Sequence, residues 1–75
     1  MQRIITHRDL SCWRAWWKDG PHKYETSDTM LRAVAKLLEN SPDRGVTMED
    51  LVIDPKVSSQ WHVEMTVQRQ DESPD

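Results

Sequence analysis

The stretch CWRAWWKDGPHKYET, residues 12–26, decides which fold the sequence predicts, because it fits both a helix and a β-hairpin. In the helical interpretation, Thr6 and Asp9 form a capping box in which Asp replaces the usual Glu or Gln. Such a helix would end at Gly20, ahead of Pro21. Its apolar side chains would then form one stripe, made of Leu10, Trp13, Trp16 and Trp17.

In the hairpin interpretation, residues 12–18 form a strand that turns at residues 19–20 and returns through residues 22–26. A two-residue turn would place favourable pairs across the two strands: Trp16 opposite Lys23, Arg14 opposite Glu25, Ala15 opposite Tyr24 and Trp17 opposite His22. Pro21 opposes this arrangement because it cannot donate the ladder hydrogen bond to Lys18, although a wider loop or an edge position would relieve the conflict. We favour the hairpin over the helix.

A helix is predicted next, over residues 27–40. Its apolar side chains recur at helical spacing and form one stripe, made of Met30, Ala33, Val34, Leu37 and Leu38. Ser27 or Asp28 can cap the N-terminus, since a short side-chain oxygen accepts a hydrogen bond from a free backbone N–H group. Pro42 cannot continue the helix and marks its end.

Two strands are predicted after the helix, at residues 51–53 and 61–67. The first is a short apolar run, and the second alternates apolar and polar side chains with the period of a strand that buries one face. Residues 56–60 supply the hairpin connection between them.

The order strand pair, helix, strand pair predicts a small α+β domain, with about four antiparallel strands and one helix packed on one face. We place this single domain at residues 1–69 and expect the acidic tail, residues 70–75, to be disordered.

The composition limits the class of protein. The chain has 75 residues and a formal net charge of −3 at pH 7, which leaves room for one domain. Cys12 is alone, so no disulfide can form within the chain, and a reducing compartment is expected. No apolar run has the length of a membrane span, and the first ten residues lack the hydrophobic core of a signal peptide. We therefore expect a cytoplasmic protein with no membrane partner.

The residues that could carry chemistry form no known motif. The soft metal-ligand types are scattered in spacings that match no compact zinc pattern, at His7, Cys12, His22 and His62. A glycine-rich phosphate loop is excluded because Gly20 and Gly45 are far apart. Cys12 and a histidine could act as the nucleophile and base of a catalytic site, but the sequence shows no third group that would orient the base. The sequence therefore predicts no metal site, no cofactor and no enzymatic activity.

The tryptophans point instead to binding. In the hairpin interpretation Trp13 and Trp17 share a face with Tyr24 and enter the core together with Trp61, whereas Trp16 points outward between cations. Tryptophan and arginine are over-represented among the residues that dominate the energy of protein interfaces. We therefore predict a partner-binding surface made of Trp16, Arg14, Lys18 and Lys23.

In size, acidic charge and order of elements, the chain resembles the small inhibitor proteins that bacteriophages encode against host systems, including anti-CRISPR proteins. This resemblance implies a non-enzymatic protein-binding module that occludes a host protein complex.

Two alternatives remain open. One is a regulator that binds nucleic acid through a basic N-terminal hairpin, with Trp16 as a stacking platform and Arg3, Arg8, Arg14, Lys18 and Lys23 as cations. Clustering of these cations on one face would favour this alternative, whereas dispersal among carboxylates would favour protein binding. The other is an antitoxin-like subunit that forms a homodimer through its sheet edge.

Overall fold

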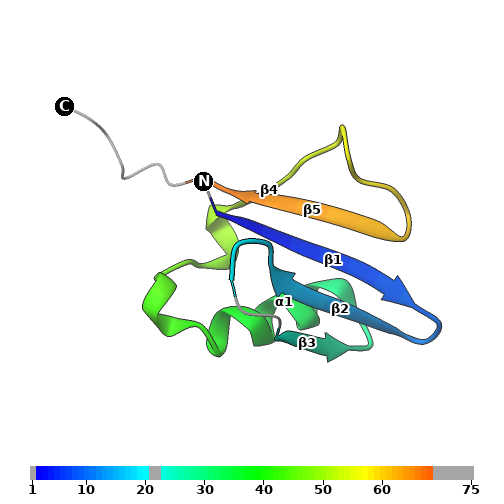
Figure 1. Ribbon diagram of the computed structural model, residues 1–75, viewed down its shortest axis with the longest axis horizontal. Helices are drawn as coiled ribbons and strands as arrows, with labels where there is room; N and C mark the ends of the chain where they lie inside the picture. The colour runs from blue at the N-terminus through cyan, green and yellow to red at the C-terminus, as the bar shows by residue number, and fades with distance from the viewer. Residues whose placement is uncertain (1, 21–22, 69–75) are drawn as a thin grey trace.

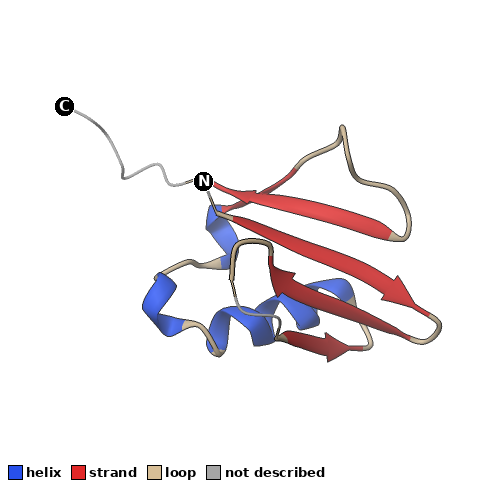
Figure 2. Cartoon of the chain, in the orientation of Figure 1, coloured by secondary structure: helices blue, strands red, loops and turns tan. Residues whose placement is uncertain are grey.

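The computed structural model describes residues 2–20 and 23–68, which form one antiparallel sheet and one α-helix, an α+β arrangement (Figures 1 and 2). The elements are β1 (Arg3–Asp9), β2 (Cys12–Trp17), β3 (Tyr24–Ser27), α1 (Met30–Glu39), β4 (Leu51–Ile53) and β5 (His62–Val67), with 3-10 turns η1 (Pro42–Arg44) and η2 (Met48–Asp50). The five strands lie in the order β3-β2-β1-β5-β4. The predicted fold class is correct, whereas the details of strand number and order are not.

The strand that the sequence did not reveal is β1, which lies at the centre of the sheet between β2 and β5. The chain thus has three strands before the helix, not two. The pattern of β1 conceals it because Ile4, Ile5 and Thr6 are consecutive and all buried, although they point to alternate faces. A strand that is covered on both faces loses the alternation by which strands are recognised.

β2 and β3 pair antiparallel, so the strand interpretation is correct and the helical one is wrong, but the predicted register is wrong by one residue. Trp16 lies opposite Tyr24, and Arg14 lies opposite Thr26. The predicted register required Pro21 to donate to Lys18; instead the Lys18 N–H donates to the Arg3 carbonyl at 3.0 Å. The shift moves Tyr24 from the core face to the face of Trp16. His22, the predicted partner of Trp17, lies outside the described residues.

The helix α1 begins three residues later than predicted. Its N-cap is Thr29, whose Oγ1 accepts a hydrogen bond from the Arg32 N–H at 3.2 Å, so neither Ser27 nor Asp28 is the cap. Ser27 is the last residue of β3, and Asp28 forms an ion pair with Arg32 instead. The helix ends at Glu39 with Asn40 as its C-cap, one residue before the predicted end.

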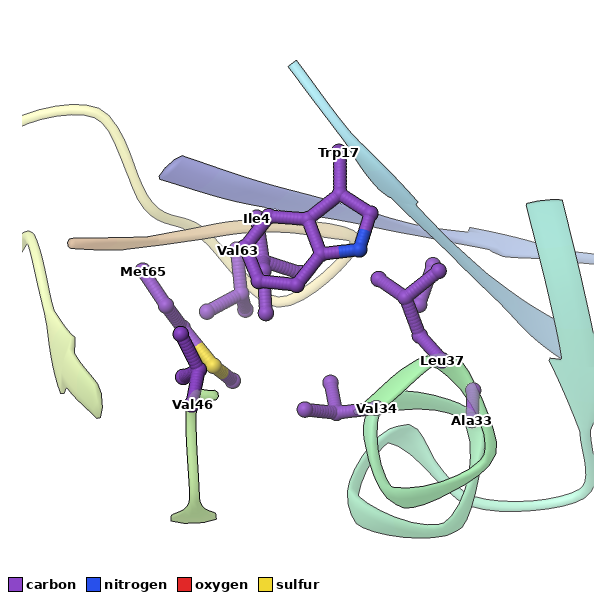
Figure 3. Close-up of a cluster of buried hydrophobic side chains, with 9 residues drawn as sticks. Ile4, Trp17, Ala33, Val34, Leu37, Val46, Val63 and Met65 are labelled. Atoms are coloured by element: carbon purple, nitrogen blue, oxygen red, sulfur yellow. The ribbon is translucent and has the colours of Figure 1, made fainter. Parts of the chain in front are cut away.

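The core lies between the sheet and α1. The helix contributes Ala33, Val34 and Leu37 to it, and Figure 3 shows them facing the sheet side chains Ile4, Trp17, Val63 and Met65, with Val46 from the connection that follows η1. Trp13 is partly buried against this cluster. The prediction for Trp61 is wrong: it precedes β5 and is 54% exposed, with the Arg8 guanidinium 5.1 Å from its ring centre.

The two edges of the sheet differ in how they are covered. The backbone of Lys18 bonds to Arg3 of β1, and along β2 successive residues bond in turn to β3 and to β1. In this alternation Ala15 bonds to Glu25 of β3. The next residue of β3, Thr26, therefore has its carbonyl pointing away from the sheet. The Lys36 ammonium of α1 donates to this carbonyl at 3.0 Å. At the other edge β4 is three residues long, and its Val52 and Ile53 side chains are exposed.

The C-terminal hairpin is the predicted one, with β4 and β5 paired antiparallel. The tail over residues 70–75, which the sequence predicts to be disordered, lies outside the described residues. Among the described residues, no helix is long and apolar enough to cross a membrane.

Candidate functional site

The side of the sheet away from α1 is the candidate functional site, and we call it the open face. Side chains alternate along each strand, so the residues between the core positions point here. Across the centre of the open face, Tyr24, Trp16, Ile5 and Glu64 lie side by side on β3, β2, β1 and β5. Ile5 is only 6% exposed, although no helix lies above it. Its cross-strand neighbours, Trp16 on β2 and Glu64 on β5, flank it on this face.

A hollow of about 290 Å³ lies on the open face, and its lining is His7, Arg14, Trp16 and Tyr24. We call it the Trp16 hollow. Two cross-strand pairs form it: Trp16 lies opposite Tyr24, and His7 lies opposite Arg14. Two aromatic rings, an imidazole and a guanidinium thus surround one space.

Arg14 is held in place on the rim of the Trp16 hollow. Its guanidinium carbon lies 5.1 Å from the centre of the Tyr24 ring, and its NH2 atom lies 2.8 Å from a carboxylate oxygen of Asp9. The Nε atom of Arg14 is buried without a hydrogen-bond partner. These contacts fix the guanidinium without using all its donors.

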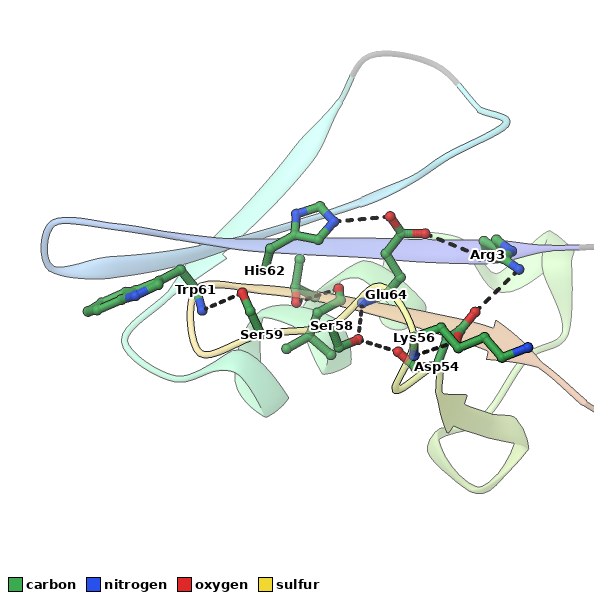
Figure 4. A network of polar contacts seen from close by, with 10 residues as sticks. Arg3, Asp54, Lys56, Ser58, Ser59, Trp61, His62 and Glu64 are labelled. Carbon is green, nitrogen blue, oxygen red and sulfur yellow. Dashed lines mark hydrogen bonds and ion pairs between the residues drawn. The ribbon is translucent and has the colours of Figure 1, made fainter.

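A chain of charged side chains crosses the other half of the open face (Figure 4). Asp54 lies 3.5 Å from the Arg3 guanidinium, which also binds Glu64 at 3.2 Å. The second oxygen of Glu64 lies 3.0 Å from Nε2 of His62. The hydrogen bond from His62 lowers the pKa of Glu64 most, and the hydrogen bond from Arg3 lowers it further. Burial of the carboxylate acts in the opposite direction and raises this pKa. Glu64 is therefore a carboxylate at neutral pH.

The connection between β4 and β5 fixes one end of this chain. The Ser58 hydroxyl donates to the Asp54 carbonyl at 2.6 Å and accepts a hydrogen bond from the Glu64 N–H at 3.1 Å. It thereby fills a gap in the ladder between the two strands and holds both carboxylates beside Arg3.

The structure brings together two of the four predicted site residues, Trp16 and Arg14, which line the Trp16 hollow. Lys18 is exposed directly after β2 and is not among the residues that line this hollow. Lys23 instead lines a second hollow, of about 270 Å³, on the side of α1.

Sequence reasoning missed Tyr24 and His7 as neighbours of Trp16. Tyr24 was assigned to the core because the register was wrong by one residue, and His7 lies on the unrecognised strand β1. A predicted loop that kept Pro21 out of the strand pairing would have shifted the register and placed Tyr24 on the face of Trp16.

The cations near the N-terminus are dispersed and mostly matched by other groups. Arg3 lies between two carboxylates, Arg14 contacts Asp9, and Arg8 stacks on Trp61. Among the described residues, no group of three or more histidine, cysteine, aspartate or glutamate side chains has the arrangement of a metal site. No protein-family model, no curated protein and no solved structure matches this chain.

Proposed function

We propose that the chain is a non-enzymatic protein-binding module whose open face holds a side chain of another protein in the Trp16 hollow. The observation that carries this proposal is the meeting of Trp16, Tyr24 and Arg14 around one hollow on paired strands of the sheet. These three residue types are enriched at the centres of protein interfaces. Because the side chains stand on paired strands, little conformational entropy is lost when a partner binds.

The charges of the open face favour a protein over a nucleic acid. A nucleic-acid surface presents cations that are free to neutralise phosphates. Here Arg3 and Arg14 already contact carboxylates, and Lys23 lines a different hollow. The dispersal of cations among carboxylates is the pattern expected for protein binding.

A matched pair of tryptophan substitutions tests the proposal. Trp16→Ala should weaken binding to the partner by about thirtyfold or more, which corresponds to about 2 kcal/mol. Trp61→Ala is the control, because Trp61 is a second accessible tryptophan beside an arginine, more exposed than the half-buried Trp16, and lies outside the Trp16 hollow. Partners captured from a bacterial lysate would be identified by mass spectrometry, and affinities would be measured by biolayer interferometry.

Two results would contradict the proposal. One is a captured partner that binds Trp16→Ala as tightly as the unsubstituted chain. The other is binding of a single-stranded oligonucleotide that quenches tryptophan fluorescence and weakens steeply with salt, which would indicate a nucleic-acid binder. The narrower expectation of a phage inhibitor stays a prediction; an activity assay of the captured complex with and without the chain would test it.

A further inference from the structure

We propose that His7 and His62 form a binding site for a divalent transition-metal ion, such as Zn²⁺, on the open face of the sheet. The two histidines lie directly opposite each other on β1 and β5, 55 residues apart in the sequence, and no spacing motif joins them. The site does not depend on the proposed protein-binding function.

The position of the pair in the ladder brings the two side chains close. The Val67 N–H donates to the Gln2 carbonyl and the Arg8 N–H donates to the Trp61 carbonyl, which places His7 and His62 at a position without hydrogen bonds between them. Opposed side chains are nearest at such positions. The ring centres of the two imidazoles are 5.9 Å apart, with the ring planes at 63°.

This separation suits two rings that share one ion. A ligating imidazole nitrogen lies about 2.1 Å from Zn²⁺, so the ring centre lies about 3.2 Å from it, and two ligating ring centres lie at most about 6.5 Å apart. Imidazole is a preferred ligand of zinc, nickel and copper ions.

Glu64 prepares His62 to bind an ion. A carboxylate can only accept a hydrogen bond, so its 3.0 Å contact with Nε2 of His62 places the ring proton on that nitrogen. Nδ1 then carries the free lone pair. Metal-binding histidines usually donate their second nitrogen to such a carboxylate, which orients the ring and raises its basicity. Arg3 holds Glu64 in turn, and neither nitrogen of His7 has a hydrogen bond to any described residue.

The surrounding charges permit a cation. Arg14 lies opposite His7, but Asp9 contacts its guanidinium at 2.8 Å, and Glu64 adds a negative charge beside His62. The chain supplies two ligands, so water or a carboxylate of a partner would complete the coordination of the ion. Because His7 also lines the Trp16 hollow, these open positions lie next to the surface that we propose binds a protein.

Calorimetric titration with Zn²⁺ tests the site, with Cys12→Ser as the background so that the free thiol cannot bind the ion. We expect one saturable site, weakened at least about tenfold by His7→Gln and equally by His62→Gln, because each removes a ligand. His22→Gln is the matched control and should leave the affinity unchanged. Glu64→Gln should weaken binding by about tenfold, because the orienting carboxylate is lost.

Three outcomes would overturn the proposal. They are the absence of saturable Zn²⁺ binding, an affinity that survives either His7→Gln or His62→Gln, and a loss caused by His22→Gln that equals theirs. Thermal unfolding of each variant without Zn²⁺ confirms that the substituted proteins are folded, and a rise in melting temperature on adding Zn²⁺ should occur only where both histidines are present.

Discussion

Trp16 and Trp17 are neighbours in the sequence, yet they belong to two surfaces with different roles. Trp17 is 4% exposed, its indole N–H donates to the Ser41 hydroxyl at 2.9 Å, and the Arg44 guanidinium carbon lies 4.2 Å from its ring centre. Trp16 points to the open face, where it lines a hollow. The comparison teaches that strand alternation places neighbouring tryptophans in different surroundings: Trp17 lies in the core on the α1 side of the sheet, and Trp16 lies on the open face, where we propose that a partner binds.

The largest expected effect tests this difference. Trp17→Ala should lower the free energy of unfolding by about 3–5 kcal/mol, because it removes a large side chain from the core. That loss is a large part of the stability of a small domain. Trp16→Ala should cost less than about 1 kcal/mol. Urea denaturation followed by circular dichroism measures both values. Equal losses would mean that the open face belongs to the core as well.

A smaller effect sharpens the comparison within the open face. Glu64→Gln should destabilise the protein at pH 7 by on the order of 1 kcal/mol, because charge-assisted hydrogen bonds from His62 and Arg3 are weakened. The folded pKa of Glu64 lies below its usual value of 4.5. The stabilisation is therefore complete above the pKa of the unfolded chain and is lost as the pH falls through the lower folded pKa.

Denaturation curves at several pH values between 7 and 3 test whether this stabilisation decreases as the pH falls. The stability of the unsubstituted protein and that of Glu64→Gln should converge at the acidic end. Glu39→Gln, which removes an exposed carboxylate outside this chain of contacts, controls for the change in net charge. A difference that grows as the pH falls would contradict the prediction.

The smallest effect concerns Leu10, which lies in the turn between β1 and β2. Leu10 is 96% exposed and has a φ of 43°, in the left-handed region that disfavours a leucine. Leu10→Asn should raise the free energy of unfolding by about 0.5–1 kcal/mol, because asparagine tolerates this conformation. Thermal and urea unfolding measure the gain. A loss of stability would show that the Leu10 side chain makes a stabilising contact.

The elements with one buried face were predictable from the sequence. The apolar stripe of α1 and the alternation of β5 follow directly from the geometry of a helix and a strand, and the structure confirms both. The outward direction of Trp16 also followed from alternation. Which face of the sheet a side chain takes relative to its neighbours in the same strand does not depend on the register with the next strand.

The features that were predicted wrongly or missed depend on how strands pair, and local sequence patterns do not specify strand pairing. β1 was missed because its consecutive Ile4 and Ile5 are both buried. The position of Tyr24 was wrong because one residue of register moves a side chain to the opposite face. The contact of His7 with His62 joins strands that are distant in sequence, so only the sheet order reveals it.

The bond from Lys36 to the outward carbonyl of Thr26 has a consequence for self-assembly. A strand from another molecule that added to β3 would have to displace the Lys36 ammonium, and one that added to β4 would have to displace the Met48 carbonyl from the outward Leu51 N–H. Both exposed edges of the sheet therefore carry an outward backbone group that is already bonded, which opposes growth of the sheet by strand addition.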